Sequence, residues 1–273
     1  MSRKSRAITF GFGRFGVNVF SDEETIDLFV RTYRSFISEL KEGQAAGEIF
    51  IEKSGDLSFK TVRGLLPLDI ERDGSLVTVA STGLKGDFDL TTFSGEVKVA
   101  ANLSVSLMEN FFRVYFSYYL LLNEALLLHS AGMELGGKGF LFVGQSGAGK
   151  STISRLLRNY GEIYSDDLVA VDLSKEDTQI LSTPFRGEET IWVGRQTGTR
   201  LVRVFFLIKS DKNEIVPVER GYAVAKLFAN SPFVNSDDEM VDLLVERINS
   251  LLERVEFYIL RFRKDGSVKE VLL

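Results

Sequence analysis

The chain has 273 residues, of which 44% are hydrophobic, and this predicts a globular protein with one large domain or a small domain beside a larger one. Its formal net charge of −5 argues against a general nucleic-acid-binding protein. It contains no cysteine, so disulfides and thiolate metal sites are excluded.

The N-terminal segment and the most apolar run argue against a targeting signal and a membrane span. Residues 1–6 are basic, but the segment after them is glycine-rich and interrupted by Arg14, so it has no signal-peptide core. The most apolar run, residues 114–128, carries Asn123 and Glu124 and is too short to cross a bilayer. We therefore expect a cytoplasmic protein that does not bind membranes.

Residues 11–16 fit the pattern G-x-G-x-x-G, which binds dinucleotides in Rossmann folds. That fingerprint requires a strand before the glycines and a helix that opens at the third glycine. Here residues 17–20 alternate like a strand, and the first helix signal is Ser21 or Asp22 as an N-cap before two glutamates. We therefore interpret these glycines as part of a β-hairpin.

The segment after the hairpin predicts a small α+β domain, which we assign to residues 1–106. Apolar residues recur at helical spacing between residues 24 and 40. Four later segments have the pattern of strands, with turn signals between them: residues 48–53, 76–80, 87–91 and 96–100. We expect an antiparallel, partly exposed sheet that carries no chemistry.

A long aromatic and leucine-rich segment, residues 108–128, follows at the start of the second predicted domain, residues 107–273. Its spacing predicts a buried helix that bridges the two halves, and a stacking platform for a base is the alternative. The only histidine, His129, then stands beside leucines at a strand end, where a lone histidine is by default a core residue. Gly136 and Gly137 predict the turn of a β-hairpin that leads into the next strand.

Residues 144–152 fit the phosphate-binding P-loop pattern G-x-x-x-x-G-K-[ST]. The apolar residues 139–143 predict a buried strand before the loop, and residues 152–158 predict a helix after it, which is the context that the motif requires. A glycine-rich turn that matches by chance is the alternative. The predicted phosphate-binding residues are Gly144, Gln145, Ser146, Gly147, Ala148, Gly149, Lys150, Ser151 and Thr152.

Each residue type in this motif has a physical role. Glycine permits backbone geometries in which successive N–H groups converge on phosphate oxygens, and the helix N-terminus adds partial positive charge. Lys150 supplies a charge for the β- and γ-phosphates, and the hydroxyl of Ser151 can ligate Mg²⁺. The sequence therefore predicts that the protein binds a nucleoside triphosphate.

Asp166 and Asp167 interrupt a predicted strand, residues 161–171, after the P-loop helix. Adjacent acids at a strand tip project in different directions, so one can hold Mg²⁺ while the other accepts a proton from an incoming hydroxyl. An acidic surface turn is the alternative.

A further loop follows residues 180–181. In this loop Arg186 can stabilise charge on a transferring phosphoryl group, and Glu188 can reach the metal or orient the arginine. A surface loop with an ion pair explains Arg186 and Glu188 nearly as well.

The remainder of the chain predicts alternating strands and helices. Residues 201–208 are predicted as a central strand, and residues 221–228 as a short helix. Residues 236–255 are predicted as an amphipathic helix that is capped by Ser236 or Asp237. Residues 256–262 and 268–273 are predicted as strands on either side of a turn.

The order of the motifs resembles one family of P-loop proteins. Regulatory GTPases require D-x-x-G and [NT]-K-x-D segments, and transporter-type ATPases require a signature like Leu-Ser-Gly-Gly-Gln; the chain has none of these. His129-Ser-Ala-Gly132, a glycine hairpin, the P-loop and Ser165-Asp-Asp167 together resemble the HPr serine kinase/phosphorylase family over residues 125–210. More closely, the chain is similar to the wider group of HPr-kinase-related proteins, whose catalytic domain resembles phosphoenolpyruvate carboxykinase.

The resemblance implies a role for each of its residues. It implies that His129 lies beside the phosphates and that Asp166 and Asp167 serve Mg²⁺ and an acceptor serine, with Lys150 and Ser151 completing the site. The glycine-rich segment that this family uses for phosphorolysis is not recognisable, and residues 183–188 replace it only loosely. The first 120 residues do not resemble the N-terminal domain of the HPr enzyme. The HPr protein is therefore not assigned as the substrate.

We accordingly expect an α/β P-loop domain of the HPr kinase and phosphoenolpyruvate carboxykinase type, preceded by a small α+β domain. The expected activity is Mg²⁺-dependent transfer of the γ-phosphoryl group of ATP to a hydroxyl of a protein or a small molecule. A nucleotide-binding regulatory or assembly module without significant transfer is the alternative, and carboxykinase-like chemistry is a weaker third. A homo-oligomer is compatible with the sequence, and the acceptor and the base preference stay open.

Overall fold

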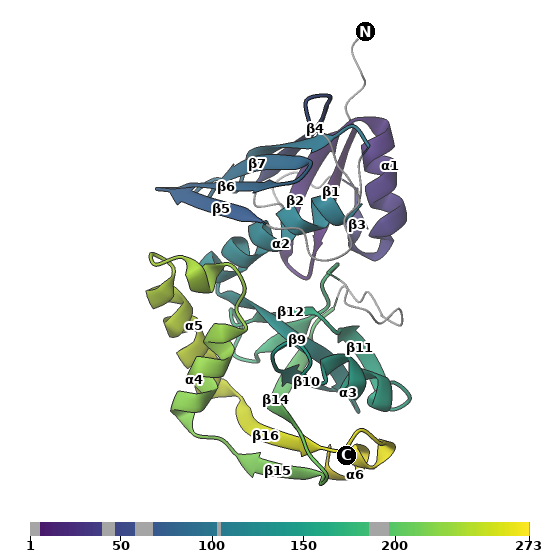
Figure 1. Ribbon diagram of the computed structural model, residues 1–273, viewed down its shortest axis with the longest axis vertical. Coiled ribbons are helices and arrows are strands. Elements are labelled where there is room, and N and C mark those ends of the chain that lie inside the picture. The colour runs from purple at the N-terminus through teal and green to yellow at the C-terminus, as the bar shows by residue number, and fades with distance from the viewer. Residues whose placement is uncertain (1–5, 40–46, 58–67, 103–104, 186–196, 273) are drawn as a thin grey trace. The chain divides into compact units, whose positions relative to one another are not determined.

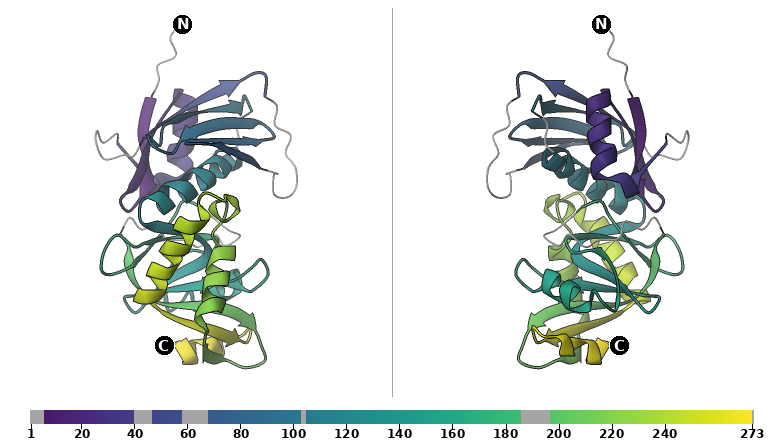
Figure 2. Two further views of the ribbon diagram at one scale, coloured as in Figure 1. Left: turned by 90° about the vertical axis from the view of Figure 1, so that its left-hand side faces the viewer. Right: turned by 90° about the vertical axis from the view of Figure 1, so that its right-hand side faces the viewer.

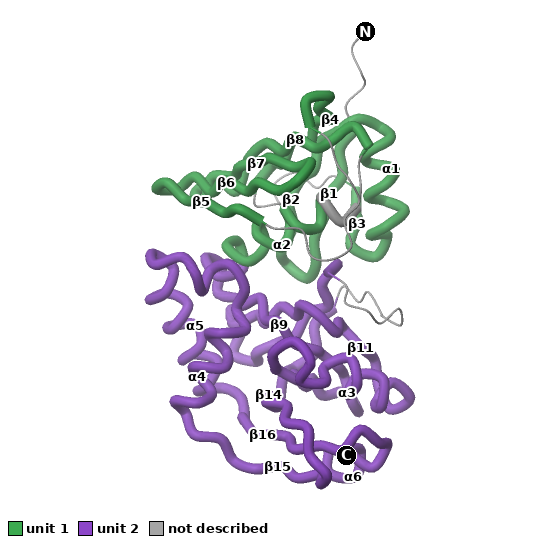
Figure 3. Tube along the Cα trace, in the orientation of Figure 1, with its two compact units in different colours: residues 1–119 green, residues 120–273 purple. Residues whose placement is uncertain are grey.

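The computed structural model describes residues 6–39, 47–57, 68–102, 105–185 and 197–272 (Figure 1). The chain divides into two compact units, Met1–Tyr119 and Leu120–Leu273, which Figure 3 colours separately. The division falls within helix α2 (Val105–Leu122), whereas the sequence prediction begins the second domain near the start of that helix. The fold is mixed α/β with two large sheets. None of the described helices is both long and apolar enough to cross a membrane.

The first unit contains a sheet in the order β3-β1-β2-β4-β8-β7-β6-β5. Most neighbours are antiparallel, as predicted, but β4 pairs in parallel with both β2 and β8, so the sheet is mixed. The strands are β1 (Arg6–Phe12), β2 (Phe15–Ser21), β3 (Ile37–Ser38), β4 (Glu48–Ser54), β5 (Asp69–Asp73), β6 (Leu76–Ser81), β7 (Leu84–Asp89) and β8 (Gly95–Ala100).

The glycines of the G-x-G-x-x-G pattern lie in the hairpin β1–β2, as predicted. Gly11 faces Gly16 across the antiparallel pair, and Gly13 lies in the turn with a φ of 55°. A Cβ on Gly11 would lie 2.1 Å from the carbonyl oxygen of Phe15, so close strand packing accounts for that glycine. No helix opens at Gly16, so these glycines lack the strand–helix context that the dinucleotide fingerprint requires.

Helices α1 (Glu23–Thr32) and α2 cover the same face of this sheet, because both contact Phe10. The ring of Phe10 lies 5.5 Å from that of Phe29 in α1 and 5.0 Å from that of Phe112 in α2, both in edge-to-face geometry. Asp22 caps α1 by accepting from the N–H of Thr25, but the helix ends at Thr32 and not near residue 40. A 3₁₀ turn, Arg34–Phe36, and strand β3 follow it.

The second unit contains a mixed sheet whose pairings β10–β9–β12–β13–β14–β10 form a closed circuit, extended on one side by β16 and β15 and on another by β11. Strand β14 pairs in parallel with both β10 and β16 and is the predicted central strand. The strands are β9 (Ala125–Leu135), β10 (Lys138–Val143), β11 (Gly161–Ser165), β12 (Leu168–Asp172), β13 (Gln179–Leu181), β14 (Thr199–Lys209), β15 (Glu214–Pro217) and β16 (Glu256–Phe262).

Helices cover both faces of β14, because its successive side chains point to opposite faces. Phe205 belongs to the core that includes Ile153 of α3 (Lys150–Leu157), whereas the ring of Phe206 lies 5.7 Å from that of Tyr222 in α4 (Arg220–Ala229). Helix α5 (Val241–Arg254) packs beside α4, and Figure 2 shows this pair and α3 on different sides of the strands.

Two predicted boundaries and one predicted element type in the second unit are wrong. Helix α2 ends at Leu122, and residues 125–128 belong to β9. Helix α5 begins at Val241, because the side chain of Asp237 accepts from the N–H of Glu239 in a separate turn and does not cap the helix. Residues 269–272 form a short helix, α6 (Lys269–Leu272), and not a strand, since Asp265 nucleates a 3₁₀ turn (Gly266–Val268) directly before it.

Candidate functional site

The glycine loop, residues 144–149, connects the end of β10 to the start of α3, so the predicted strand and helix are both present. All of β10 after Lys138 is buried, and its neighbours β9 and β14 fix it on both sides. On the helix, Ile153 and Leu157 pack into the core with Phe142 of β10. The two ends of the loop are therefore anchored in one buried core.

Two glycines of the loop adopt conformations that other residues rarely adopt. Gly147 has a φ of 78°, and Gly149, the N-cap of α3, has a φ of 112°. A Cβ on Gly149 would lie 2.6 Å from Cζ of Phe262, which is fully buried. Residues 145–147 are exposed, so a ligand can reach the backbone of the loop. The first N–H groups of an α-helix have no acceptor within the helix, and no side chain caps α3 at Gly149.

Lys150 is the first residue of α3 and is only 7% exposed. Its Nζ donates a hydrogen bond of 2.7 Å to the carbonyl of Gly144, so the lysine closes the loop on itself. Burial lowers the pKa of this ammonium, and the nearby negative charges of Asp167 and Asp166 oppose that shift. The ammonium of Lys150 therefore interacts electrostatically with both carboxylates.

Asp166 and Asp167 form the bend between β11 and β12, where the predicted strand is broken. Strand β12 pairs antiparallel with β9, and Leu168 stands opposite His129 in that register. This register brings Nε2 of His129 to 3.3 Å from Oδ1 of Asp167. His129 is 36% exposed at its side chain, so it is not the core histidine that a lone histidine beside leucines would suggest.

Buried hydroxyl groups fix the backbone around the two aspartates. Oγ of Ser165 accepts from the N–H of Asp167 and donates to the carbonyl of Phe185, both at 3.1 Å. Oγ1 of Thr183 donates to the carbonyl of Leu168 at 2.6 Å. Sequence reasoning did not assign these hydroxyls, although Ser165 adjoins the aspartate pair and Thr183 begins the next predicted loop.

A contact from α4 positions His129 and has no signal in the sequence. The N–H of His129 donates to the carbonyl of Asn230, the C-cap of α4, at 2.7 Å. Asn230 is 3% exposed, and its own Nδ2 donates to the carbonyl of Lys226. The end of α4 is therefore locked to the strand that carries the histidine.

The structure thus brings four predicted residues together: His129, Lys150, Asp166 and Asp167. Ser151 and Thr152 follow in the first turn of α3 and are half-buried. Arg186 and Glu188 lie outside the described residues. Within the part of the chain that is described, no three His, Cys, Asp or Glu side chains are grouped so as to hold a metal ion.

Residues 96–272 match the model of the family described as SynChlorMet cassette protein ScmC. The match covers more than half of the chain, so the protein belongs to that family. The matched region includes the whole candidate site and all of the second unit up to residue 272. No curated protein matches the sequence.

Proposed function

We propose that this member of the ScmC family transfers the γ-phosphoryl group of ATP to a hydroxyl of a protein or a small molecule, with Mg²⁺ as cofactor. The observation that supports this most is the convergence of a lysine, two carboxylates and a histidine beside the glycine loop. The same order of motifs is the basis of the resemblance to HPr-kinase-related proteins, which supports a P-loop domain of that type.

The glycine loop and Lys150 would bind the phosphates. The loop offers backbone N–H groups and an accessible surface at residues 145–147. The ammonium of Lys150 has three donors, so it can keep its hydrogen bond to Gly144 and still donate to a phosphate oxygen. Its burial strengthens that attraction, because charges interact more strongly away from water.

The residues present fit Mg²⁺ bound together with the nucleotide. This ion is usually held by one or two carboxylates, substrate phosphates and water, so a protein-only cage is not required. Asp166, which is 6% exposed, and the hydroxyl of Ser151 are the groups that would hold it. When bound, Mg²⁺ neutralises charge on the phosphate oxygens.

Asp167 is the proposed general base. It is less buried than Asp166, and Nε2–H of His129 can donate to its carboxylate and hold it in place. The acceptor hydroxyl gives its proton to Asp167 as its oxygen forms a bond to the γ-phosphorus. The bond between that phosphorus and the β–γ bridging oxygen breaks in the same displacement, and its electron pair leaves with ADP.

The decisive experiment incubates the protein with γ-labelled ATP, Mg²⁺ and extract of its own cells. Loss of a general base should lower transfer by about 10²–10⁴-fold in Asp167→Asn. Asp166→Asn should also lower transfer, and its transfer should require a higher Mg²⁺ concentration, because a metal ligand is lost. Asp211→Asn, at an exposed loop of the same unit, is the matched control and should label normally. Equal labelling by the wild type and both site variants would refute the catalytic role, whereas tight ATP binding without any labelled product would favour a regulatory module.

A further inference from the structure

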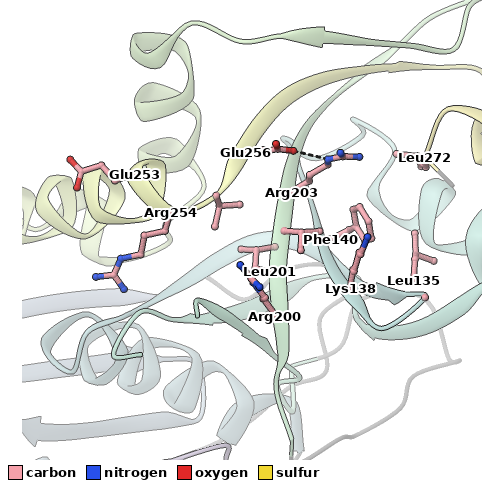
Figure 4. Close-up of a pocket in the computed structure, with 13 residues that line it drawn as sticks. Leu135, Lys138, Phe140, Arg200, Leu201, Arg203, Glu253, Arg254, Glu256 and Leu272 are labelled. Carbon is pink, nitrogen blue, oxygen red and sulfur yellow. Dashed lines mark hydrogen bonds and ion pairs between the residues drawn. The ribbon is translucent and has the colours of Figure 1, made fainter. Parts of the chain in front are cut away.

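A cavity lies in the second unit, at the other end of β10 from the glycine loop (Figure 4). Its volume is about 700 Å³, which is within the size range of small-molecule sites. Lys138 begins β10 beside the cavity and Val143 ends the strand at the glycine loop, so roughly 17 Å of strand separate the two places. The cavity is therefore distinct from the proposed phosphate site.

The floor of the cavity is apolar and firmly held. Phe140, Leu201 and Leu272 line it, and each is at most 6% exposed. They come from β10, β14 and α6, which are packed in one core. An apolar group of a ligand would therefore meet a preformed surface.

Basic side chains outnumber acidic ones around this floor, although the whole chain is acidic. The charged lining residues are Lys138, Arg200, Arg203, Arg254, Glu253 and Glu256. Two of the arginines are engaged elsewhere, since Nε of Arg200 pairs with Asp177 at 3.2 Å and Arg254 donates to the carbonyl of Leu173 at 2.6 Å.

Lys138 and Arg203 are the basic residues of the lining that could donate hydrogen bonds to a ligand. Nε of Arg203 pairs with Oε2 of Glu256 at 2.9 Å, drawn as the dashed line in Figure 4, and this holds the guanidinium at the cavity. Its two terminal nitrogens, and Nζ of Lys138, have no hydrogen-bond or ion-pair partner among the described residues. Figure 4 shows Lys138 beside the ring of Phe140. A fixed guanidinium and an ammonium on a flexible stem thus stand next to an apolar floor.

We propose that this cavity binds an organic acid with a ring or branched apolar body. The carboxylate or other anionic group would accept hydrogen bonds from the terminal nitrogens of Arg203, whose planar fork matches two oxygens, and from Lys138. The apolar body would cover Phe140 and Leu201. This site does not depend on the proposed phosphotransferase activity.

The test is isothermal titration calorimetry of the full chain with benzene-1,3-dicarboxylate as the probe. Benzene-1,3-dimethanol has the same ring without charge and should bind much more weakly. Lys138→Gln and Arg203→Gln should each weaken binding of the dicarboxylate by about tenfold, because each removes one charge-assisted contact. Lys209→Gln, an exposed lysine at the far end of β14, is the matched control and should bind like the wild type. Far-UV circular dichroism verifies that every variant is folded.

Three results would overturn the proposal. The first is the absence of saturable binding to the wild type. The second is equal binding by folded Lys138→Gln, Arg203→Gln and Lys209→Gln. The third is displacement of the probe by ATP at one-to-one stoichiometry, which would place the probe at the glycine loop. Binding that survives saturating ATP and is lost in the first two variants supports the second site.

Discussion

Gly149→Ala tests whether the glycine loop is held in its conformation by the core beneath it. At a φ of 112° a residue with a Cβ is in a left-handed conformation, which costs roughly 1–2 kcal/mol. The new Cβ would also lie 2.6 Å from Cζ of Phe262. Because Phe262 is fully buried and cannot swing into solvent, this overpacking should cost about 1–3 kcal/mol more.

The expected total for Gly149→Ala is roughly 2–5 kcal/mol out of a stability of about 5–15 kcal/mol, so the variant should fold but unfold at a clearly lower urea concentration. Gly147→Ala is the matched control: its φ is 78°, but a Cβ there meets no atom within 4 Å, so only the conformational cost applies. Urea denaturation followed by circular dichroism gives both midpoints.

Equal urea midpoints for Gly149→Ala and Gly147→Ala would refute this reasoning, because the clash with Phe262 would then add nothing to the loss of stability. Phe262→Leu supplies a further check. Its smaller side chain should relieve part of the clash with the new Cβ at position 149 and leave the conformational cost, so the effects of Gly149→Ala and Phe262→Leu should not be additive.

The remaining predictions concern charge and a rejected motif. Lys150→Met should weaken ATP–Mg²⁺ binding by roughly tenfold or more, since a charge-assisted contact is lost; unchanged affinity of the folded variant in calorimetry would contradict the phosphate site. Hydrogen bonds from Ser75, Thr91 and Thr92 hold the pKa of Asp89 well below its usual range, so its stabilising effect is present above about pH 4 and is lost as the pH falls through the folded pKa. The difference in unfolding free energy between the wild type and Asp89→Asn should therefore shrink below that pH, and a difference that grows there would disprove the assignment. Calorimetry with NAD should show no saturable heat of binding. Micromolar binding that Gly13→Val abolishes would show that residues 11–16 bind a dinucleotide after all.

Local signals in the sequence predicted the elements around the candidate site. The run 139–143 predicted a buried strand before the glycines, and Gly136-Gly137 predicted the hairpin before it, where both residues have a positive φ. The strand break at the aspartates was also visible, because polar residues interrupt an apolar run there.

Contacts between distant segments could not be predicted. Nothing near His129 indicates that its N–H will meet the carbonyl of Asn230, and nothing near Gly149 indicates Phe262. The end of α2 was missed because an apolar run after a helix fits helix and strand equally well. Glu124, with a φ of 53°, turns the chain there and directs residues 125–128 into β9. The parallel pairing of β4 likewise depends on partners from both sides of the sequence.

The contact between Gly149 and Phe262 has a consequence for the order of folding. The strand–loop–helix segment can form hairpin and helix early from local interactions, but β10 gains its parallel partner only when β14 arrives, and the floor under Gly149 is complete only with β16. Parallel pairing over such sequence separations is slow compared with local structure. During synthesis, the loop would therefore lack its final packing until residue 262 has left the ribosome, and one edge of β10 would meanwhile be unpaired.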